Sequence, residues 1–345
     1  MAQETIPVEK PWVELLEEEI PTRKISWFER AIGPELYRII KGLLTTPISV
    51  IGIVLLALFV IVALAAPAIM PPIPGTDPML IPRDGFYPVP QPPGSPWVTN
   101  APPLPFWWQG IMHTDQMVHV LGTTGGQYDI LYGLVWGTRT AFYTGLAITV
   151  AALIIGLIVG SLAAYYGGVL DNVLMRIVDI FMTLPFLMAA LILSAILIPK
   201  IGRSPLPAMI ALIAFGWMGY SRLVRGDILT VRERDYVLAA RVLGVPDRQI
   251  LLRHILPNAI YPTLVIASMD IGGYVLSYAA LSFLGVGVEE GYAEWGQMAS
   301  YARDWITQIG QYWYNVVYPG IALTLFVLAW NLIGDAFRDI SDPRL

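Results

Sequence analysis

The chain has 345 residues, of which 56% are hydrophobic and only 14% are charged, and its mean hydropathy is +0.61. Soluble domains carry about 25% charged residues, so this composition excludes an ordinary soluble domain and indicates a membrane protein. The chain has no cysteine, which excludes disulfides and thiolate metal sites. Its net charge of −5 gives no basic footprint for nucleic acid.

The first 46 residues mix acidic and basic side chains and contain no early apolar run. They are therefore not a signal peptide, and we expect a cytoplasmic N-terminal segment over residues 1–46. A first membrane span is predicted at residues 47–70, within a stretch that has no charge between Lys41 and Asp77. About 20 apolar residues are enough for a helix to cross a bilayer.

Residues 71–138 are rich in proline and contain Trp97, Trp107 and Trp108. A disordered linker normally lacks such aromatic residues, so we expect an ordered extracytoplasmic loop here. His113 and His119 share this loop, whereas the remaining histidine lies much later in the chain. The histidines are therefore not expected to form a metal site.

The remaining gaps between charges predict five further spans, which together with the first make six. Residues 139–336 are expected to form the transmembrane core, and residues 337–345 a cytoplasmic C-terminus. The edges follow the uncharged runs, such as those from Arg139 to Asp171 and from Asp304 to Asp335. The five predicted spans are residues 141–165, 173–198, 206–224, 260–286 and 315–335.

The lysines and arginines predict the orientation. They concentrate before residue 47 and between residues 222 and 253, whereas residues 71–138 and the loop between spans five and six carry one each, Arg83 and Arg303. Cytoplasmic loops carry the excess of positive charge, so both termini and segment 225–258 are expected in the cytoplasm. Lys200 and Arg203 go against this assignment but are outnumbered.

Residues 236–258 are too charged to form a seventh span. Arg241, Asp247, Arg248 and Arg253 would together cost roughly 10–14 kcal/mol at the centre of a bilayer. The apolar residues instead recur at helical spacing, which predicts two short amphipathic helices on either side of Gly244-Val245-Pro246. The apolar residues that recur are Val237, Ala240, Leu243, Ile250, Leu251 and Ile255. From this pattern alone, a hairpin lying on the membrane surface and a hairpin that docks a protein remain equally open.

A spaced motif in the same stretch favours docking. Ala239-Ala240 is followed after three residues by Gly244, and after nine more by His254-Ile255-Leu256-Pro257. This pattern resembles the cytoplasmic "EAA" loop of ABC importer permeases, and the ending Arg253 to Asn258 resembles the oligopeptide/dipeptide/nickel branch. Leu238 stands where that family has its glutamate.

Further blocks carry the same resemblance in the same order. They are residues 119–139, 175–185, 279–285 and 318–344. The chain is thereby identified as a member of this permease branch. The departures from the branch pattern are Thr124 for an aspartate, Gln127-Tyr128 for Gly-Arg, and Tyr278 for a glutamate.

The resemblance implies an all-α membrane protein with six transmembrane helices, the ABC importer type I transmembrane fold and alternating access in the inner membrane. It implies a heterodimer with a homologous permease, two ATP-binding subunits that carry ATP and magnesium, and an extracytoplasmic substrate-binding protein. It implies no cofactor on this chain. The loop 225–258 would be the coupling helix that lies in a groove of the ATPase. The residues expected to couple are Ala239, Ala240, Arg241, Val242, Leu243, Gly244, Asp247, Arg253, His254, Leu256 and Pro257.

Peptides are the leading cargo, with nickel and oligosaccharides as alternatives within the same branch. The chain has no G-x-x-x-x-G-K-[ST] motif, so it is not expected to bind ATP phosphates itself. An ATP-independent secondary transporter would not need the docking hairpin, and a membrane scaffold would not explain its motif. An intramembrane enzyme would need a catalytic cluster at depth, where we find only Asp270.

Asp270 falls near the middle of the fifth span, where ionisable groups usually mark a pathway. The alternative is a structural aspartate hydrogen-bonded to Tyr274, Tyr278 or the sister permease, and we hold the two equal. Arg176 and Asp179 are three residues apart and therefore share a helix face, so we expect a structural ion pair rather than a gate. Gly156 and Gly160 predict close helix packing within the chain. The loop 71–138 either docks the binding protein or caps the bundle.

Overall fold

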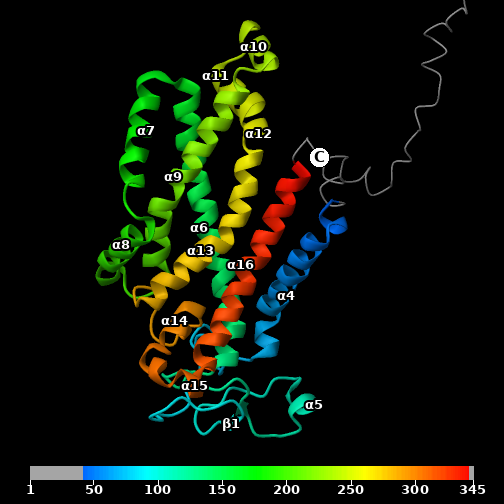
Figure 1. The fold of residues 1–345 in the computed structure, drawn as a ribbon, viewed down its shortest axis with the longest axis vertical. Helices are drawn as coiled ribbons and strands as arrows, with labels where there is room; N and C mark the ends of the chain where they lie inside the picture. The colour runs from blue at the N-terminus through cyan, green and yellow to red at the C-terminus, as the bar shows by residue number, and fades with distance from the viewer. Residues whose placement is uncertain (1–41, 342–345) are drawn as a thin grey trace, which may run out of the picture.

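The computed structural model describes residues 42–341, and it is a bundle of long helices with an ordered loop region at one end (Figure 1). The predicted terminal segments at residues 1–41 and 342–345 lie outside this range. The long helices are α4 (Pro47–Ile69), α6 (Ile130–Tyr166), α7 (Gly168–Met182), α8 (Phe186–Ile201), α9 (Pro205–Val231), α13 (Tyr261–Phe283) and α16 (Tyr314–Ser341).

The two ends of the bundle carry different structures (Figure 1). One, which we call the hairpin end, carries α10 (Asp235–Val242), α11 (Asp247–Gln249), the π-helix η1 (Ile250–Ile255) and α12 (Leu256–Ala259). The opposite one, the loop end, carries residues 70–129 and the segment between α13 and α16. Its short elements are β1 (Ser95–Pro96), α5 (Trp108–Met112), β2 (Val118–His119), α14 (Trp295–Ser300), the 3₁₀ helix η2 (Arg303–Gln308) and α15 (Ile309–Tyr312).

Within the described residues, five helices are long and apolar enough to cross a membrane, namely α4, α6, α9, α13 and α16. The remaining predicted span, residues 173–198, is not one straight helix, because α7 and α8 meet at an angle of 86°. Pro185 explains the break: proline disfavours helical geometry at the residue before it, and α7 ends at Met182. The predicted span over residues 173–198 is thus broken into two helices, which together pass the test of length and composition for a membrane span.

Helix α6 begins at Ile130, inside the segment that the sequence assigned to the loop. Asp129 caps this helix, since its carboxylate accepts a hydrogen bond of 2.6 Å from the backbone N–H of Tyr132. Arg139 lies within the helix rather than at its start. The gap between charges therefore gave the apolar part of α6 but missed about its first three turns.

Helices α6 and α9 are held close together by two glycines. A Cβ atom on Gly156 would lie 2.5 Å from the Cβ of Tyr220, and one on Gly160 would lie 2.5 Å from the carbonyl oxygen of Ser221. Any larger side chain would push the helices apart. This confirms that the G-x-x-x-G pattern serves packing inside the chain.

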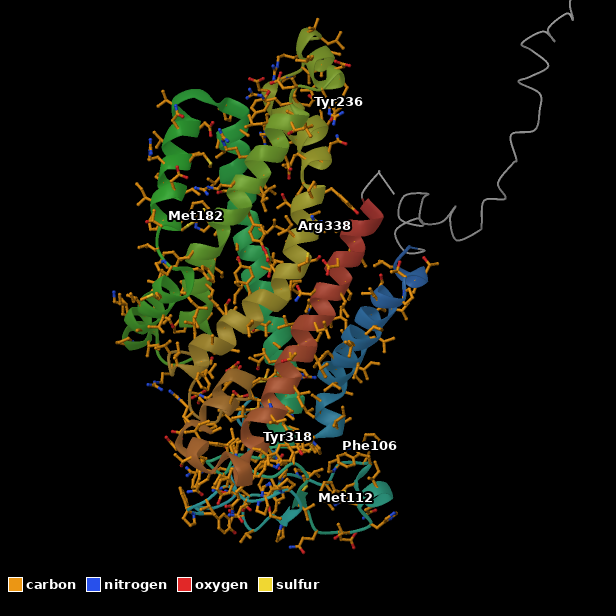
Figure 2. All side chains as sticks on the ribbon, in the orientation of Figure 1. Phe106, Met112, Met182, Tyr236, Tyr318 and Arg338 are labelled. Carbon is orange, nitrogen blue, oxygen red and sulfur yellow. The ribbon has the colours of Figure 1, made fainter. Side chains whose placement is uncertain are left out.

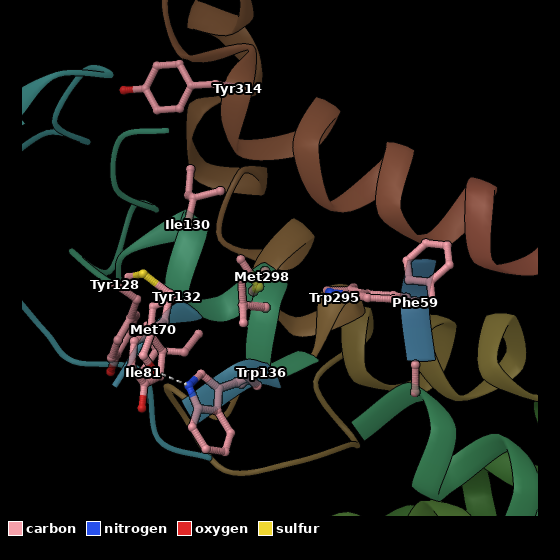
Figure 3. Close-up of a cluster of buried hydrophobic side chains, with 14 of the residues drawn as sticks. Phe59, Met70, Ile81, Tyr128, Ile130, Tyr132, Trp136, Trp295, Met298 and Tyr314 are labelled. Atoms are coloured by element: carbon pink, nitrogen blue, oxygen red, sulfur yellow. Dashed lines mark hydrogen bonds between the residues drawn. The ribbon is translucent and has the colours of Figure 1, made fainter. Parts of the chain in front are cut away.

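The loop end is ordered and packs onto the bundle through a shared apolar core (Figure 3). Strands β1 and β2 pair antiparallel, and isolated bridges join Leu80 to Tyr292 and Arg83 to Tyr128. The Trp136 indole N–H on α6 donates to the Met70 carbonyl just after α4, at 2.9 Å. The core includes Phe59, Met70, Ile81, Tyr132, Trp136, Trp295, Met298 and Tyr314.

A buried polar triad lies within this end. The His119 ring faces two carboxylates, with Nδ1 2.7 Å from Asp129 and Nε2 3.2 Å from Asp84. Burial raises the pKa of Asp84, but hydrogen bonds from the Thr99 N–H and from His119 outweigh it and hold that pKa below its usual value. Asp129 thus both caps α6 and anchors the loop through His119.

Candidate functional site

The hairpin end is an extension of α9 and α13 that folds back onto the bundle. The side chains of Val237, Ala240, Ile250 and Ile255 are buried there, together with Ala164, Val224 and Ile228 from α6 and α9. All four belong to the apolar residues that recur at helical spacing in the sequence. The hairpin is therefore a packed unit rather than a loose loop, with its charged residues Arg241, Arg248 and Arg253 exposed.

The corner between the two arms of the hairpin depends on Gly244. Its φ is +75°, in the left-handed region that favours glycine. The Gly244 N–H bonds to the Arg241 carbonyl and the Val245 N–H to the Ala240 carbonyl, both at 3.1 Å, which is the Schellman pattern for ending a helix. Pro246 then precedes the second arm, as predicted, and the N–H groups of Gln249 and Ile250 bond to its carbonyl.

The second arm is not a uniform α-helix. It starts with one α-turn and widens into the π-helix η1 before α12. Pro257 lacks the N–H that an α-helix would pair with the carbonyl four residues earlier. His254 is half-buried on this arm, and the Asn258 side chain donates to its carbonyl at 2.8 Å.

The tip of the hairpin exposes two large apolar side chains. Val242 is 88% exposed and Leu243 is 82% exposed, so Leu243 does not share the buried face of Val237 and Ala240 although it recurs at helical spacing. The helix α10 ends at Val242, and beyond that point the helical spacing no longer places residue 243. Ala239 is exposed beside them and Ala240 is buried. Val242 and Leu243 are thus two adjacent large apolar side chains in contact with solvent at the tip of a charged hairpin.

Two contacts fix the hairpin to α6, and a third joins the two helices that carry its arms. The Arg232 guanidinium donates to the Ala164 carbonyl at the end of α6, at 2.8 Å. The Tyr165 hydroxyl donates to Asp247 at 2.6 Å. Thr263 on α13 donates to Asp227 on α9 at 3.2 Å. The hairpin is therefore tied to α6, and α9 is tied to α13 beside it.

Asp270 lies in a cleft on one side of the bundle, about halfway along α13. The Tyr220 hydroxyl on α9 donates to its carboxylate at 2.7 Å. The two tyrosines that were predicted to bond to Asp270 have other surroundings. Tyr274 donates to the Gly216 carbonyl at 3.1 Å, and Tyr278 is buried in an apolar cluster that also contains Tyr220 and Tyr274. The cleft has a volume of about 350 Å³ and is lined by Phe186, Phe215, Gly216, Gly219, Asp270, Gly273, Tyr274 and Ser277.

Asp179 pairs with Arg222 on α9, so the predicted pair with Arg176 is wrong. Sequence spacing identifies only neighbours on one helix, whereas α7 lies against α9. Asp171 on α7 likewise makes two hydrogen bonds of 2.6 Å to Arg225 on α9. Arg176 lines a polar depression beside these pairs.

Tyr220, Arg222 and Arg225 could not be identified as partners from the sequence. Their only sequence signal was their place on a predicted span or at its edge. No spacing rule connects Tyr220 to Asp270, because they come from different helices. Val242 and Leu243 were expected among the coupling residues, and their place beside the helix-ending Gly244 fits their exposure.

Comparison with known proteins agrees with this architecture. Residues 152–345, more than half of the chain, match the family described as the binding-protein-dependent transport system inner membrane component. A dipeptide transport system permease protein, DppC of Escherichia coli, is 39% identical over 71% of this chain and 77% of its own length. A putative peptide transport system permease protein of Brucella suis is 36% identical over 73% and 82%.

The fold also has a counterpart among solved structures. A chain of the MetNI methionine ABC transporter in an inward-facing conformation aligns with a TM-score of 0.51 and 20% identity, over 61% of this chain and 98% of that one. At this identity the likeness concerns the fold alone, and it confirms the predicted type I transmembrane architecture. The chain therefore belongs to the binding-protein-dependent transport system inner membrane components, the permease subunits of ABC importers.

Proposed function

We propose that this permease imports peptides and is driven by separate ATP-binding subunits that bind the hairpin end. The peptide cargo is supported by relatives that are named as peptide and dipeptide permeases. The observation that carries the coupling is the hairpin tip, where Val242 and Leu243 project from a unit that is otherwise packed onto α6 and α9.

The proposed orientation places the hairpin end and both termini in the cytoplasm. Among the described residues, the hairpin end carries Arg232, Arg234, Arg241, Arg248 and Arg253, whereas Arg83 and Arg303 are the arginines of the loop end. Excess positive charge favours the cytoplasmic side. The loop end then faces the substrate-binding protein outside the plasma membrane.

In the assembly that we propose, a homologous permease provides the other half of the path, and two ATPase subunits bind ATP and magnesium. This chain itself carries no cofactor. The apolar tip enters a groove of one ATPase, with Ala239 and Gly244 allowing close approach and Asp247, Arg253 and His254 along the second arm. Leu256 and Pro257 join this arm to α13, so movement of the ATPase is passed into the bundle.

The coupling is tested by substitutions at the tip. Because the chain has no cysteine, V242C and L243C can be crosslinked one at a time to the purified ATPase, with F106C at the loop end as a control. The double variant V242D/L243D is expected to lower ATP-driven peptide uptake about tenfold or more, since a residue central to an interface contributes about 2 kcal/mol. Normal uptake by this variant, or crosslinks from F106C alone, would contradict the proposal.

The cleft at Asp270 is proposed as part of the path that cargo follows. The support is a carboxylate at membrane depth that lines an open cleft and is held by one tyrosine. D270N keeps the size of the side chain and an acceptor for Tyr220. Slower uptake by D270N at normal expression supports a role of the charge in the path, and unchanged uptake assigns Asp270 to structure. Asp179 and Arg222 are interpreted as a structural tie rather than a gate, with Arg176 beside them.

A further inference from the structure

The segment before and within α5 exposes apolar side chains in an otherwise well-packed loop region. Phe106 is 81% exposed and Ile111 is 66% exposed, and Leu104 is exposed beside them. Large apolar groups clustered on an ordered surface indicate a binding surface. The position and the charge of this segment identify what covers it.

The segment is fixed at the point where the first span ends. The Trp107 indole N–H donates to the carbonyl oxygen of Ile69, the last residue of α4, at 2.8 Å. Trp108 is fully buried next to it, with the two ring centroids 5.4 Å apart. A chain leaving a transmembrane helix is at the membrane surface, which is where tryptophan is enriched. The exposed side chains are therefore held at that depth.

The apolar surface of the segment continues the outer surface of α4. This helix lies at the edge of the bundle with Leu58, Ile61 and Leu64 exposed, so its outer face contacts lipid. Figure 1 shows α5 at the loop end on the same side as α4, away from the other long helices. Figure 2 shows Phe106 between the end of α4 and α5.

The composition of the segment also favours lipid over a protein partner. Residues 85–114 contain no aspartate, glutamate, lysine or arginine, so no charge has to leave water when the segment enters the membrane surface. Protein interfaces are normally rimmed by polar and charged residues that remain in contact with water. A surface without charges, next to a lipid-facing helix, fits the boundary between headgroups and acyl chains.

We propose that residues 104–111 form an interfacial anchor, in which Leu104, Phe106 and Ile111 insert into the bilayer surface at the loop end. The anchor holds the loop at a fixed depth relative to α4. It does not depend on the identity of the cargo or on the ATPase.

The test uses the cysteine-free sequence. F106C and I111C, each labelled with the environment-sensitive fluorophore NBD, are placed in the full chain in phospholipid vesicles. We expect emission at shorter wavelength than in water and strong quenching by lipids that carry a nitroxide near the headgroup. V98C is the matched control. Val98 is exposed on the same uncharged stretch, but its N–H is bound to the buried Asp84 rather than placed at the end of α4. A label there is expected to emit as in water.

Both labelled positions are exposed, so the substitutions remove no buried contact, and an unchanged melting temperature checks the fold. Water-like emission and no lipid quenching at both positions would overturn the proposal. Emission that changes only when the substrate-binding protein is added would also overturn it, and would assign the surface to that protein.

Discussion

The guanidinium of Arg139 on α6 donates to the backbone carbonyl of Ala63 on α4, with Nε 2.6 Å from the oxygen. Ala63 lies four residues before Pro67, which is inside α4 and has no N–H to complete the helical hydrogen bond. Arg139 also donates to the Leu64 carbonyl at 3.3 Å. One side chain thus replaces the donor that proline removed and joins two spans.

R139M is expected to destabilise the protein by about 1–3 kcal/mol, because a carbonyl in an apolar environment loses its donor. P67A returns an N–H to the helix, so P67A/R139M is expected to be more stable than R139M alone. Thermal unfolding of the purified chain in detergent, compared across the two single variants and the double variant, measures the coupling. Equal losses in R139M and in the double variant would show that Arg139 does not replace this donor.

G160A is expected to destabilise the bundle by about 1–3 kcal/mol, as overpacking does in cores. The added methyl would meet the Ser221 carbonyl of α9. G226A on α9 is the control, because a Cβ there has nothing within 4 Å, and alanine favours a helix over glycine by about 1 kcal/mol. Melting temperatures should fall for G160A and stay equal or rise for G226A.

G244A is expected to loosen the hairpin, because a non-glycine residue in the left-handed conformation costs about 1–2 kcal/mol. G244N is the milder comparison, since asparagine tolerates that region. Hydrogen exchange of residues 240–250 should accelerate in G244A and less in G244N, with the transmembrane helices unchanged. Equal exchange in both variants would show that the corner does not need its left-handed residue.

Glu294 is expected to make stability depend on pH. Burial raises its pKa to about 7, against hydrogen bonds from the Gly296 and Gln297 N–H groups. The folded protein therefore holds this proton more tightly than the unfolded chain. The resulting stability is fully present below pH 4.5 and is lost as the pH rises through about 7, a difference of about 3 kcal/mol. E294Q should flatten the dependence of melting temperature on pH between 5 and 8.

The sequence predicted what depends on composition along the chain. Uncharged runs located α4, α13 and α16 closely, because crossing lipid requires a continuous apolar helix. The same rule could not show the bend at Thr183 to Pro185, since a bent span and a straight one have the same hydropathy. Pro185 is the sequence signal for the bend, but a prediction from uncharged runs does not take proline into account.

The site was predictable where it depends on local geometry and not where it depends on tertiary packing. Gly244 and Pro246 punctuate the hairpin as expected, because their backbone preferences are local. The partners of Asp179 and Asp270 lie on α9, and no local rule selects Arg222 or Tyr220 among the residues of another helix. Leu243 continues the helical spacing of Val237 and Ala240 in the sequence, but helix α10 ends one residue earlier, at Val242.

The uninterrupted helix α6 has a mechanical consequence. Its 37 residues span about 55 Å, and no proline interrupts them. At one end its Ala164 carbonyl receives Arg232 from the hairpin, and at the other end its cap Asp129 binds His119. A displacement at the hairpin end would thus be transmitted to the loop end along one rigid helix, without passing through a loop.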